Sequence, residues 1–337
     1  MSKPNPATAI GVDIGASRLK LTLVDQAGTV LMSTSGPTPR EGTGKDVVDG
    51  VAAQTRAFRD SARAAGFAPA GIGVDVPHMI DGEQWTQRWA NSLPAIDDLP
   101  VHPMLSERLG GRLAMTNDAT AAVMAEHLFG RGRDVDRLLL MAIGTGISIG
   151  VIADGQVLDY NWGTAGDTGQ IIVDTAGLNN CSCGGHGCLE TVASGTGIAA
   201  ELTRAVGRGE NSILADRVEA GQAVTARDVA DAARAGDALA SRIFERAGFF
   251  VSVALATYVH LFRPHLIVLS GGVMNSSDLL LDGIQSWLPR LASPARLVGL
   301  RRIELSAFPD LGASIGSAGL ILFPGRYLAR SFGEVAP

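Results

Sequence analysis

Short apolar runs alternate with helical patterns along this chain, and several of the runs end at glycine. Residues 8–13, 19–24 and 138–143 are apolar and β-favouring, and the first and the third lead into glycine-containing turns. Residues 265–269 repeat this arrangement before a third turn, Ser270-Gly271-Gly272. Short apolar runs that are bounded by turn residues are typical of buried strands. The alternation of these strands with helices predicts an α/β protein.

Further strands and helices fill the intervals between these runs. A turn at Ala27-Gly28 leads into a further predicted strand. The other predicted strands cover residues 70–76, 113–116, 147–152 and 156–158, the last two as a hairpin around Asp154-Gly155. Helical periodicity predicts helices over residues 47–65, 119–128, 223–235 and 238–262. Because strand, turn and helix recur in both halves, we expect two α/β lobes with a hinge near residues 112–118.

Composition limits the class of protein. At about 100–200 residues per domain, 337 residues suggest two domains, and the 46% share of hydrophobic residues is ample for two cores. The net charge of −6 and the 5% share of aromatic residues argue against a nucleic-acid-binding protein. The longest apolar stretch, residues 247–262, is shorter than the roughly 20 residues of a membrane span, so we expect no membrane segment. Residues 1–9 lack the apolar core of a secretory signal, which favours the cytoplasm.

Two of the glycine turns have the composition of phosphate-binding loops. In the first, Gly15 lets the backbone approach a phosphate, and Asp13 would orient Mg²⁺ through water. Lys20 or Arg18 adds positive charge. In the second, Gly144-Thr145-Gly146 follows a buried strand and can cradle an anion. Neither turn matches the Walker A pattern, and an ordinary hairpin and a plain turn are the alternatives.

An aspartate between these turns is a candidate general base. Asp118 ends a predicted strand and begins a predicted helix, next to Asn117. This position is also typical of a helix N-cap, and taken alone it favours the cap. Because an aspartate beside the attacking hydroxyl group and two phosphate loops meet the needs of phosphoryl transfer, we favour the base. The combination predicts ATP-dependent phosphorylation of a hydroxyl group.

The three cysteines of the chain form one cluster, Cys181-x-Cys183-Gly184-x-x-Gly187-Cys188. An odd number of cysteines at such short spacing indicates metal ligation rather than a disulfide framework. Three thiolates on a glycine-rich knuckle suit a tetrahedral Zn²⁺ that needs one further ligand. Three unligated buried thiols are the alternative. Glu190 follows the knuckle closely, so the knuckle could aim its carboxylate.

Taken together, these residues resemble the ROK family (repressors, open reading frames and sugar kinases) of the actin-like/hexokinase superfamily. The resemblance covers about residues 8–325, and the order and spacing of its segments are more specific than any single segment. Those segments are Asp13–Lys20, Gly71–Pro77, Asn117–Ala122, Gly144–Gly150, Gly166–Gln170, Cys181–Glu190, Val224–Asp237 and Pro264–Val273. Members without N-terminal DNA-binding helices are mostly ATP-dependent sugar kinases, and there is no room for such helices before Ala7. We therefore expect a kinase.

The resemblance implies a fold and an organisation. It implies an α/β fold of two ribonuclease-H-like (actin-like ATPase) lobes with a cleft between them. We expect residues 1–115 to form the smaller lobe, with a C-terminal helix over residues 313–330 packing back on it. Residues 116–312 form the expected larger lobe with the zinc knuckle. A homodimer is the expected assembly, because family members are commonly dimers or tetramers.

The resemblance also implies roles for single residues. Asp118 is the expected catalytic base, and the expected cofactors are ATP, Mg²⁺ and a structural Zn²⁺ on the three cysteines. The expected nucleotide-side residues are Asp13, Gly15, Lys20, Gly144, Thr145, Gly146, Gly271 and Gly272. The expected sugar-side residues are Asn91, Asn117, Asp118 and Glu190, together with His78, Asp167 and Gln170.

Three of the sugar-side positions depart from the family pattern. Asp167 and Gln170 stand where the family usually has the glutamate and the histidine of Glu-x-Gly-His, and His78 stands where it has a glycine. Because Asp167, Glu190 and Asp118 would give the site three carboxylates, we expect an amino sugar rather than plain glucose, phosphorylated at a primary hydroxyl such as the 6-position. The alternatives are a glucokinase and a catalytically silent sugar-sensing protein.

Overall fold

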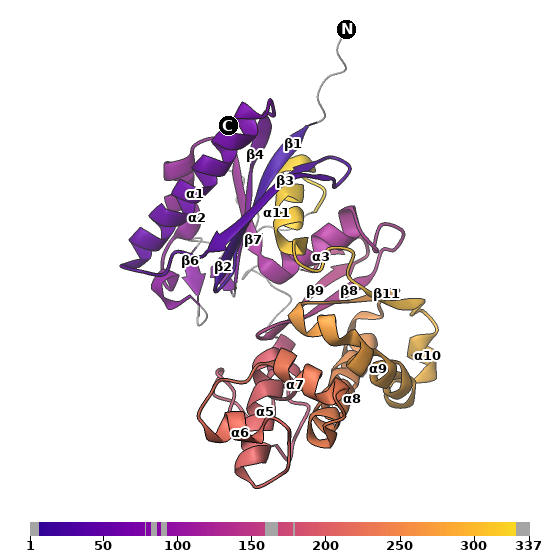
Figure 1. Ribbon diagram of the computed structural model, residues 1–337. Helices are drawn as coiled ribbons and strands as arrows, with labels where there is room; N and C mark the ends of the chain where they lie inside the picture. Colours follow the sequence, from indigo (N-terminus) through magenta and orange to yellow (C-terminus); the bar gives the residue numbers. More distant parts are fainter. Residues whose placement is uncertain are drawn as a thin grey trace. The chain divides into compact units, whose positions relative to one another are not determined.

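Two five-stranded sheets contain most of the strands that the sequence predicts (Figure 1). The computed structural model describes residues 7–77, 79–81, 86–88, 93–158, 168–177 and 179–327. The first sheet has the order β3-β2-β1-β4-β7, in which β2 is antiparallel to β1 and β3, while β4 is parallel to β1 and β7. Its strands are β1 (Thr8–Ile14), β2 (Arg18–Asp25), β3 (Val30–Pro37), β4 (Pro69–Val76) and β7 (Leu113–Asn117).

The second sheet has the order β10-β9-β8-β11-β12. Its β9 and β10 form the predicted hairpin, and the turn residues Asp154 and Gly155 have φ angles of 50° and 75°. A two-residue hairpin turn of the favoured kind requires a positive φ at both central residues. The strands are β8 (Leu138–Ile143), β9 (Ile147–Ala153), β10 (Gln156–Val157), β11 (Leu266–Ser270) and β12 (Arg302–Leu305).

The two sheets and the helices between them confirm the predicted α/β class. The sequence pattern did not predict a small extra sheet of β5 (Met79–Asp81) and β6 (Thr86–Arg88). None of the described helices combines the length and the hydropathy that are needed to cross a membrane.

The chain forms two compact units. The first holds Met1–Leu140, Gly150–Gly166 and Ser306–Pro337, and the second holds Met141–Ile149 and Asp167–Leu305. The boundaries of these units differ from those of the two lobes that the sequence suggests. The lobe boundary between residues 115 and 116 therefore stays a prediction.

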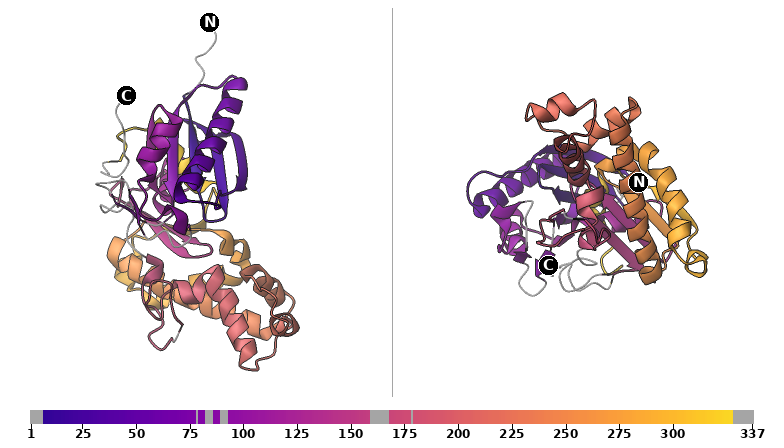
Figure 2. Two further views of the ribbon diagram at one scale, coloured as in Figure 1. Left: turned by 90° about the vertical axis from the view of Figure 1, so that its left-hand side faces the viewer. Right: turned by 90° about the horizontal axis from the view of Figure 1, so that it is seen from below.

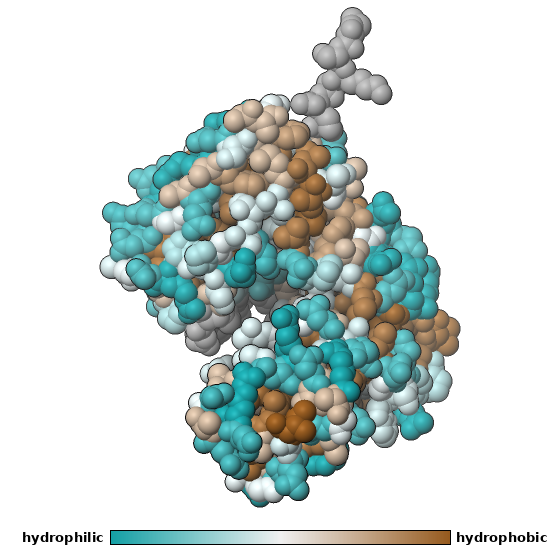
Figure 3. All heavy atoms as spheres, in the orientation of Figure 1, coloured by the Kyte–Doolittle hydropathy of each residue, from teal (hydrophilic) through white to brown (hydrophobic). Residues whose placement is uncertain are grey.

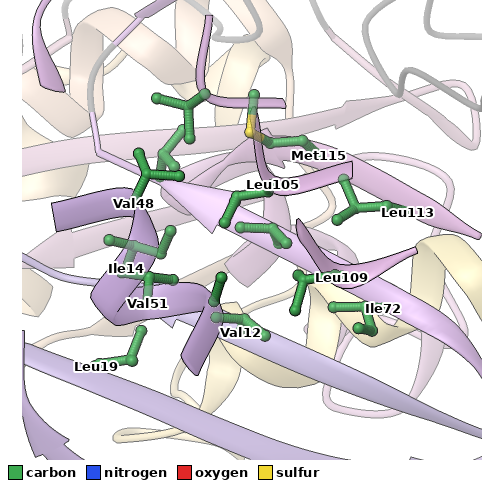
Figure 4. Packing of buried hydrophobic residues seen from close by; sticks show 14 of the residues in the cluster. Val12, Ile14, Leu19, Val48, Val51, Ile72, Leu105, Leu109, Leu113 and Met115 are labelled. Atoms are coloured by element: carbon green, nitrogen blue, oxygen red, sulfur yellow. The ribbon is translucent and has the colours of Figure 1, made fainter. Parts of the chain in front are cut away.

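The hydrophobic core of the first unit lies between its sheet and the helices α1 (Gly44–Ala64) and α2 (Val101–Leu109). Every second residue of β1, at Ile10, Val12 and Ile14, packs into this core. Figure 4 shows Val12 and Ile14 among the packed side chains. This is the alternation expected of a strand whose two faces meet different surroundings. Hydrophilic side chains cover much of the outer surface of α1 (Figure 3).

The opposite face of this sheet is covered by α11 (Gly312–Leu322), which also packs against α3 (Asp118–Leu128). Figure 2 shows α1 and α11 on opposite sides of the sheet. Glycines make the contact close, because a Cβ atom on Gly11 or Gly73 would lie 1.7 or 1.8 Å from a backbone oxygen of α11. A Cβ atom on Gly316 would lie 1.7 Å from a backbone oxygen of α3. At these three positions the close contact leaves no room for a side chain.

The C-terminal helix is shorter than the predicted range of residues 313–330. It ends at Leu322, two residues before Pro324. The residue before a proline is disfavoured in the α conformation, and Gly325 adopts a φ of 72°. The proline and the glycine therefore stop the helix, and residues 328–330 lie outside the described part of the chain.

Helices of the second unit begin and end at local signals. The long helix α8 (Ala238–Phe262) has the predicted bounds, with Asp237 as its N-cap and Arg263 in the left-handed region at its end. Helix α7 (Ala226–Arg234) begins later than the predicted residue 223, because Thr225 forms a capping box there. The other helices of this unit are α4 (Glu190–Ala193), α5 (Gly195–Gly207), α6 (Ala215–Glu219), α9 (Ser277–Leu291) and α10 (Pro294–Leu297).

Candidate functional site

A row of polar residues crosses the first sheet near the carboxyl ends of its parallel strands. Asp13 of β1 is paired in register with Lys20 of β2 on one side and with Asp75 of β4 on the other. Asp75 is paired in turn with Thr116 of β7. Paired residues of neighbouring strands point to the same face of a sheet. The row therefore brings two carboxyl groups side by side, and Lys20 Nζ lies 3.0 Å from Asp13 Oδ2.

Asp75 is a residue of this row that the sequence reasoning missed. Its side chain is fully buried, and its burial, followed by the charges of Asp13 and Asp118, raises the pKa of the carboxyl well above its usual range. The available signal was an acidic residue inside the apolar run Gly71–Val76, where a buried carboxylate is costly unless it has a partner.

Asp118 is the first residue of α3 and is not the N-cap of this helix. The N-cap is Asn117, whose Oδ1 accepts hydrogen bonds from the backbone N–H groups of Ala119 and Thr120 at 2.9 and 3.4 Å. Asp118 is partly exposed. Desolvation and the nearby Asp13 charge raise the pKa of its carboxyl to about 6, against the hydrogen bond from Ala119. Asp118 is therefore available for chemistry near neutral pH.

The turn between β1 and β2 is held in one shape by its own backbone and by Thr38. The N–H of Gly15 donates to the carbonyl of Arg18 at 3.1 Å, and a Cβ atom at Gly15 would lie 2.9 Å from that same oxygen. Thr38 donates its N–H to the Ser17 carbonyl at 3.1 Å and its hydroxyl to the Gly15 carbonyl at 2.7 Å. No local pattern marks Thr38, because it reaches this turn from the far end of β3.

The second glycine turn lies in the other unit and is bound to Glu190. A Cβ atom at Gly146 would lie 2.4 Å from Glu190 Oε2, and that oxygen accepts a hydrogen bond from the N–H of Ile147 at 3.0 Å. Burial raises the pKa of the Glu190 carboxyl, while the hydrogen bond from Ile147 lowers it. The Gly144 carbonyl accepts from the N–H of Gly195 at 2.8 Å, and the turn residue Thr145 is exposed. The sequence predicted both pieces but not their direct contact.

The third glycine turn requires glycine at its first position. Gly271 follows β11 with a φ of 91°, and a Cβ atom there would lie 2.5 Å from the Ile143 carbonyl oxygen of β8. Gly272 is exposed. Gln170 is partly exposed and ends a short 3-10 helix, Thr168–Gln170. The predicted residues His78, Asn91 and Asp167 lie outside the described residues.

The three cysteines form the cluster that their spacing predicts. The sulfur atoms of Cys181, Cys183 and Cys188 all lie within 4.8 Å of one another, and Cys183 Sγ is 3.7 Å from Cys188 Sγ. This separation is too long for a disulfide. It is close to the distance of about 3.8 Å between two sulfur ligands at the corners of a zinc tetrahedron. The three thiols could therefore supply three of the four ligands of a tetrahedral metal ion.

Comparison with known proteins gives matches that cover most of the chain. The model of the ROK family matches residues 9–322. The glucokinase of Thermotoga maritima is 29% identical over 312 residues, which cover 93% of this chain and 96% of that protein. The N-acetylglucosamine repressor of Escherichia coli O157:H7 is 28% identical over 307 residues, which cover 90% of this chain and 74% of that protein.

A solved structure shares the fold. The ROK family glucokinase from Streptomyces griseus, solved in complex with glucose and AMPPNP, matches with a TM-score of 0.76 and 27% identity. The match covers 93% of this chain and 99% of that one. The predicted actin-like ATPase fold is thereby confirmed.

Proposed function

Because the chain belongs to the ROK family, we propose that this ATP-dependent sugar kinase phosphorylates a hexose derivative at its 6-hydroxyl and prefers an amino sugar to plain glucose. The kinase activity follows from the similarity to glucokinases over most of the chain. The 6-position of the hydroxyl is proposed from the family resemblance, and the preference for an amino sugar from the altered sugar-side residues.

The proposed phosphoryl transfer is supported mainly by the exposure and the raised pKa of the Asp118 carboxyl. Its carboxyl is partly exposed, and its pKa of about 6 lies close to neutral pH, where a general base works best. In the proposed reaction Asp118 accepts the proton of the sugar hydroxyl. The oxygen then forms a bond to the γ-phosphorus of ATP as the bond to the β,γ-bridging oxygen breaks, which releases ADP.

The remaining nucleotide-side residues bind and orient. Mg²⁺ that accompanies ATP neutralises charge on the phosphates, and the buried carboxylate of Asp13 is the kind of hard oxygen ligand that this ion takes. Lys20 holds Asp13 in place and adds positive charge. We assign phosphate binding to Gly15 and to Gly144–Gly146 from the family resemblance. The turn at Gly15 also requires glycine for its own shape, because a Cβ atom there would meet the Arg18 carbonyl oxygen. Gly271-Gly272 is proposed for the adenosine.

Thr38 is expected to affect ATP binding without taking part in the chemistry. Thr38→Val removes the hydroxyl that holds the Gly15 carbonyl at 2.7 Å, a loss of about 1 kcal/mol. We expect the KM for ATP to rise by about fivefold and kcat to change less. Thr38→Ser keeps the hydroxyl and is the control. Steady-state kinetics with varied ATP would contradict this role if both variants had the KM of the unaltered protein.

The preference for an amino sugar rests on the altered sugar-side residues. At Gln170 an amide stands where the family usually has an imidazole. We assign sugar binding to this residue and to His78, Asn91, Asn117, Asp167 and Glu190. The carboxylates of Asp118, Asp167 and Glu190 would attract an ammonium group. The similarity to a protein named as an N-acetylglucosamine repressor supports an amino-sugar derivative.

A panel of five sugars tests this specificity. We expect kcat/KM for glucosamine or 3-amino-3-deoxyglucose to exceed that for glucose, with N-acetylglucosamine and N-acetylmannosamine measured beside them. A site that hydrogen-bonds particular groups strongly rejects analogues without them. If glucose is the best of the five, the protein is a glucokinase. If no sugar releases ADP while sugars still bind, it is a silent sensor.

We also propose that the three cysteines hold a structural Zn²⁺. Their sulfur geometry supports this, and Gln170, His186 or water would complete the tetrahedron. The ion would fix the knuckle that precedes Glu190.

A homodimer in the cytoplasm is proposed from the family resemblance. The apolar side chains of Leu261 and Val298, which are 66% and 86% exposed, are candidate contacts between the two subunits.

The zinc proposal predicts about one zinc atom per chain in gently purified protein, measured by elemental analysis. Because the cluster supplies three ligands, a chelator should remove the ion faster than from a four-ligand site. Gln170→His should slow this release if Gln170 stands beside the metal. Protein that contains no zinc before chelator treatment would refute the proposal.

A further inference from the structure

The buried Asp75 carboxyl has no role in the mechanism above. Its side chain is 0% exposed, and no hydrogen-bond donor reaches either of its oxygen atoms among the described residues. A buried carboxylate without a donor is strongly unfavourable, and such groups in native proteins are normally paired with a cation or hydrogen-bonded. The two oxygen atoms of Asp75 therefore indicate a partner that the described residues do not supply.

The position of Asp75 shows where that partner would bind. Asp75 stands opposite Asp13 on the neighbouring parallel strand, and the two side chains point to the same face as Gly11 and Gly73, the face that α11 covers further along. When both carboxyl groups are ionised, neither offers a proton to the other, and the charge of Asp13 and its side-chain contact with Asp75 add to burial in raising the pKa of Asp75. The one cation in this row, Lys20, already lies 3.0 Å from Asp13 Oδ2.

A bound divalent cation would match the charge that this cluster has when its three aspartates are ionised. Asp13, Asp75 and Asp118 carry three negative charges when ionised, and Lys20 carries one positive charge, so the sum is −2. Asp13 and Asp75 are adjacent in register on neighbouring strands, whereas Asp118 lies on α3. A divalent cation at the pair of Asp13 and Asp75 balances the charge and leaves Asp118 as the base.

We propose that Asp75 is a second carboxylate of the Mg²⁺ site, acting with Asp13 on the ion that accompanies ATP. This rests on the proposed kinase function. Mg²⁺ is commonly held by one or two carboxylates together with substrate phosphates, and it retains several waters. Asp13 and Asp75 supply the two carboxylates within one unit of the fold. The competing explanation is that Asp75 carries a proton and serves only the packing of the sheet.

The experiment compares the affinity for a non-hydrolysable ATP analogue, AMPPNP, in excess Mg²⁺ and in EDTA, by titration calorimetry. The ratio of the two dissociation constants measures the coupling between metal and nucleotide, which is reciprocal. The variant is Asp75→Asn, which keeps the shape of the side chain and removes its charge. Asp60→Asn, on the exposed side of α1, is the matched control.

For the unaltered protein and Asp60→Asn we expect Mg²⁺ to tighten AMPPNP binding to the same extent. In Asp75→Asn this tightening should fall at least tenfold, while binding in EDTA is unchanged or stronger because a negative charge near the phosphates is gone. A ratio within twofold of the unaltered protein overturns the proposal and leaves the kinase assignment intact. Failure of the unaltered protein to bind AMPPNP in either condition contradicts the kinase function itself.

Folding of the variant is checked in the same samples. Replacement of a buried carboxyl group that has no hydrogen-bond donor among the described residues should not lower the thermal midpoint without Mg²⁺. The rise of the midpoint on adding Mg²⁺ and AMPPNP together should shrink. If Asp75→Asn does not fold, Asp75→Ala replaces it and is judged by the same ratio. A purely structural Asp75 would change the midpoint and leave the Mg²⁺ dependence as it is.

Discussion

Replacement of Asp118 by asparagine is expected to lower kcat by on the order of 10²–10⁴ while nucleotide and sugar binding persist. The amide has the shape of the carboxylate but cannot accept the proton of the sugar hydroxyl. Helix α3 should remain intact, because Asn117 and not Asp118 provides its N-cap. The measurement is kcat with saturating substrates, with the sugar dissociation constant from calorimetry. A kcat within a few-fold of the unaltered protein would remove Asp118 from the mechanism.

The pH dependence provides an independent check of the same residue. Only the ionised form of Asp118 accepts a proton, and its pKa is raised to about 6. Activity should therefore be full above this pH and fall about tenfold per pH unit below it. The residual activity of Asp118→Asn should lack this decline. Asp60→Asn, at an exposed carboxyl of α1, should keep the profile of the unaltered protein.

Gly11→Ala is expected to cost about 3 kcal/mol of unfolding free energy or more, because overpacking at a tight contact is destabilising. The new Cβ atom would lie 1.7 Å from the Ser314 carbonyl oxygen, so α11 must move away from the sheet. Backbone atoms cannot turn aside as a flexible side chain can. Unfolding in denaturant, followed by circular dichroism, measures the loss.

The matched control is Gly36→Ala in β3 of the same sheet. A Cβ atom there would meet only Gln54 Oε1, at 3.4 Å, which is the end of a long side chain. We expect this change to be neutral or mildly stabilising, since a strand interior favours alanine over glycine. If both variants unfold at the same denaturant concentration, the close contact of α11 does not limit stability.

Local signals in the sequence explain the parts of the fold that were predicted well. The bounds of α8 follow from an apolar periodicity that is framed by a capping aspartate and by Arg263-Pro264. The hairpin of β9 and β10 follows from Asp154-Gly155. The cysteine cluster follows from spacing alone. In each case the residues that decide the structure are neighbours in the sequence.

The missed features depend on residues that are distant in the sequence. Asp75 lies beside Asp13 only because β4 pairs with β1. The sequence of neither strand shows which strand it pairs with. Thr38 reaches the Gly15 turn after the whole of β2 and β3. Glu190 touches Gly146 through a fold of the intervening chain. Periodicity predicts elements, whereas these contacts depend on register and packing.

The close fit of α11 on the first sheet has a consequence for how the chain folds during synthesis. Every residue of the second unit is made before α11, so the strands that carry Gly11 and Gly73 leave the ribosome long before the helix that covers them. Domains generally fold as units, the N-terminal one first, during synthesis. Here the second unit can complete its own packing while the first still has one face of its sheet uncovered. The order of emergence and the order of completion are therefore reversed, and the nascent chain is most exposed to aggregation at the sheet that was made first.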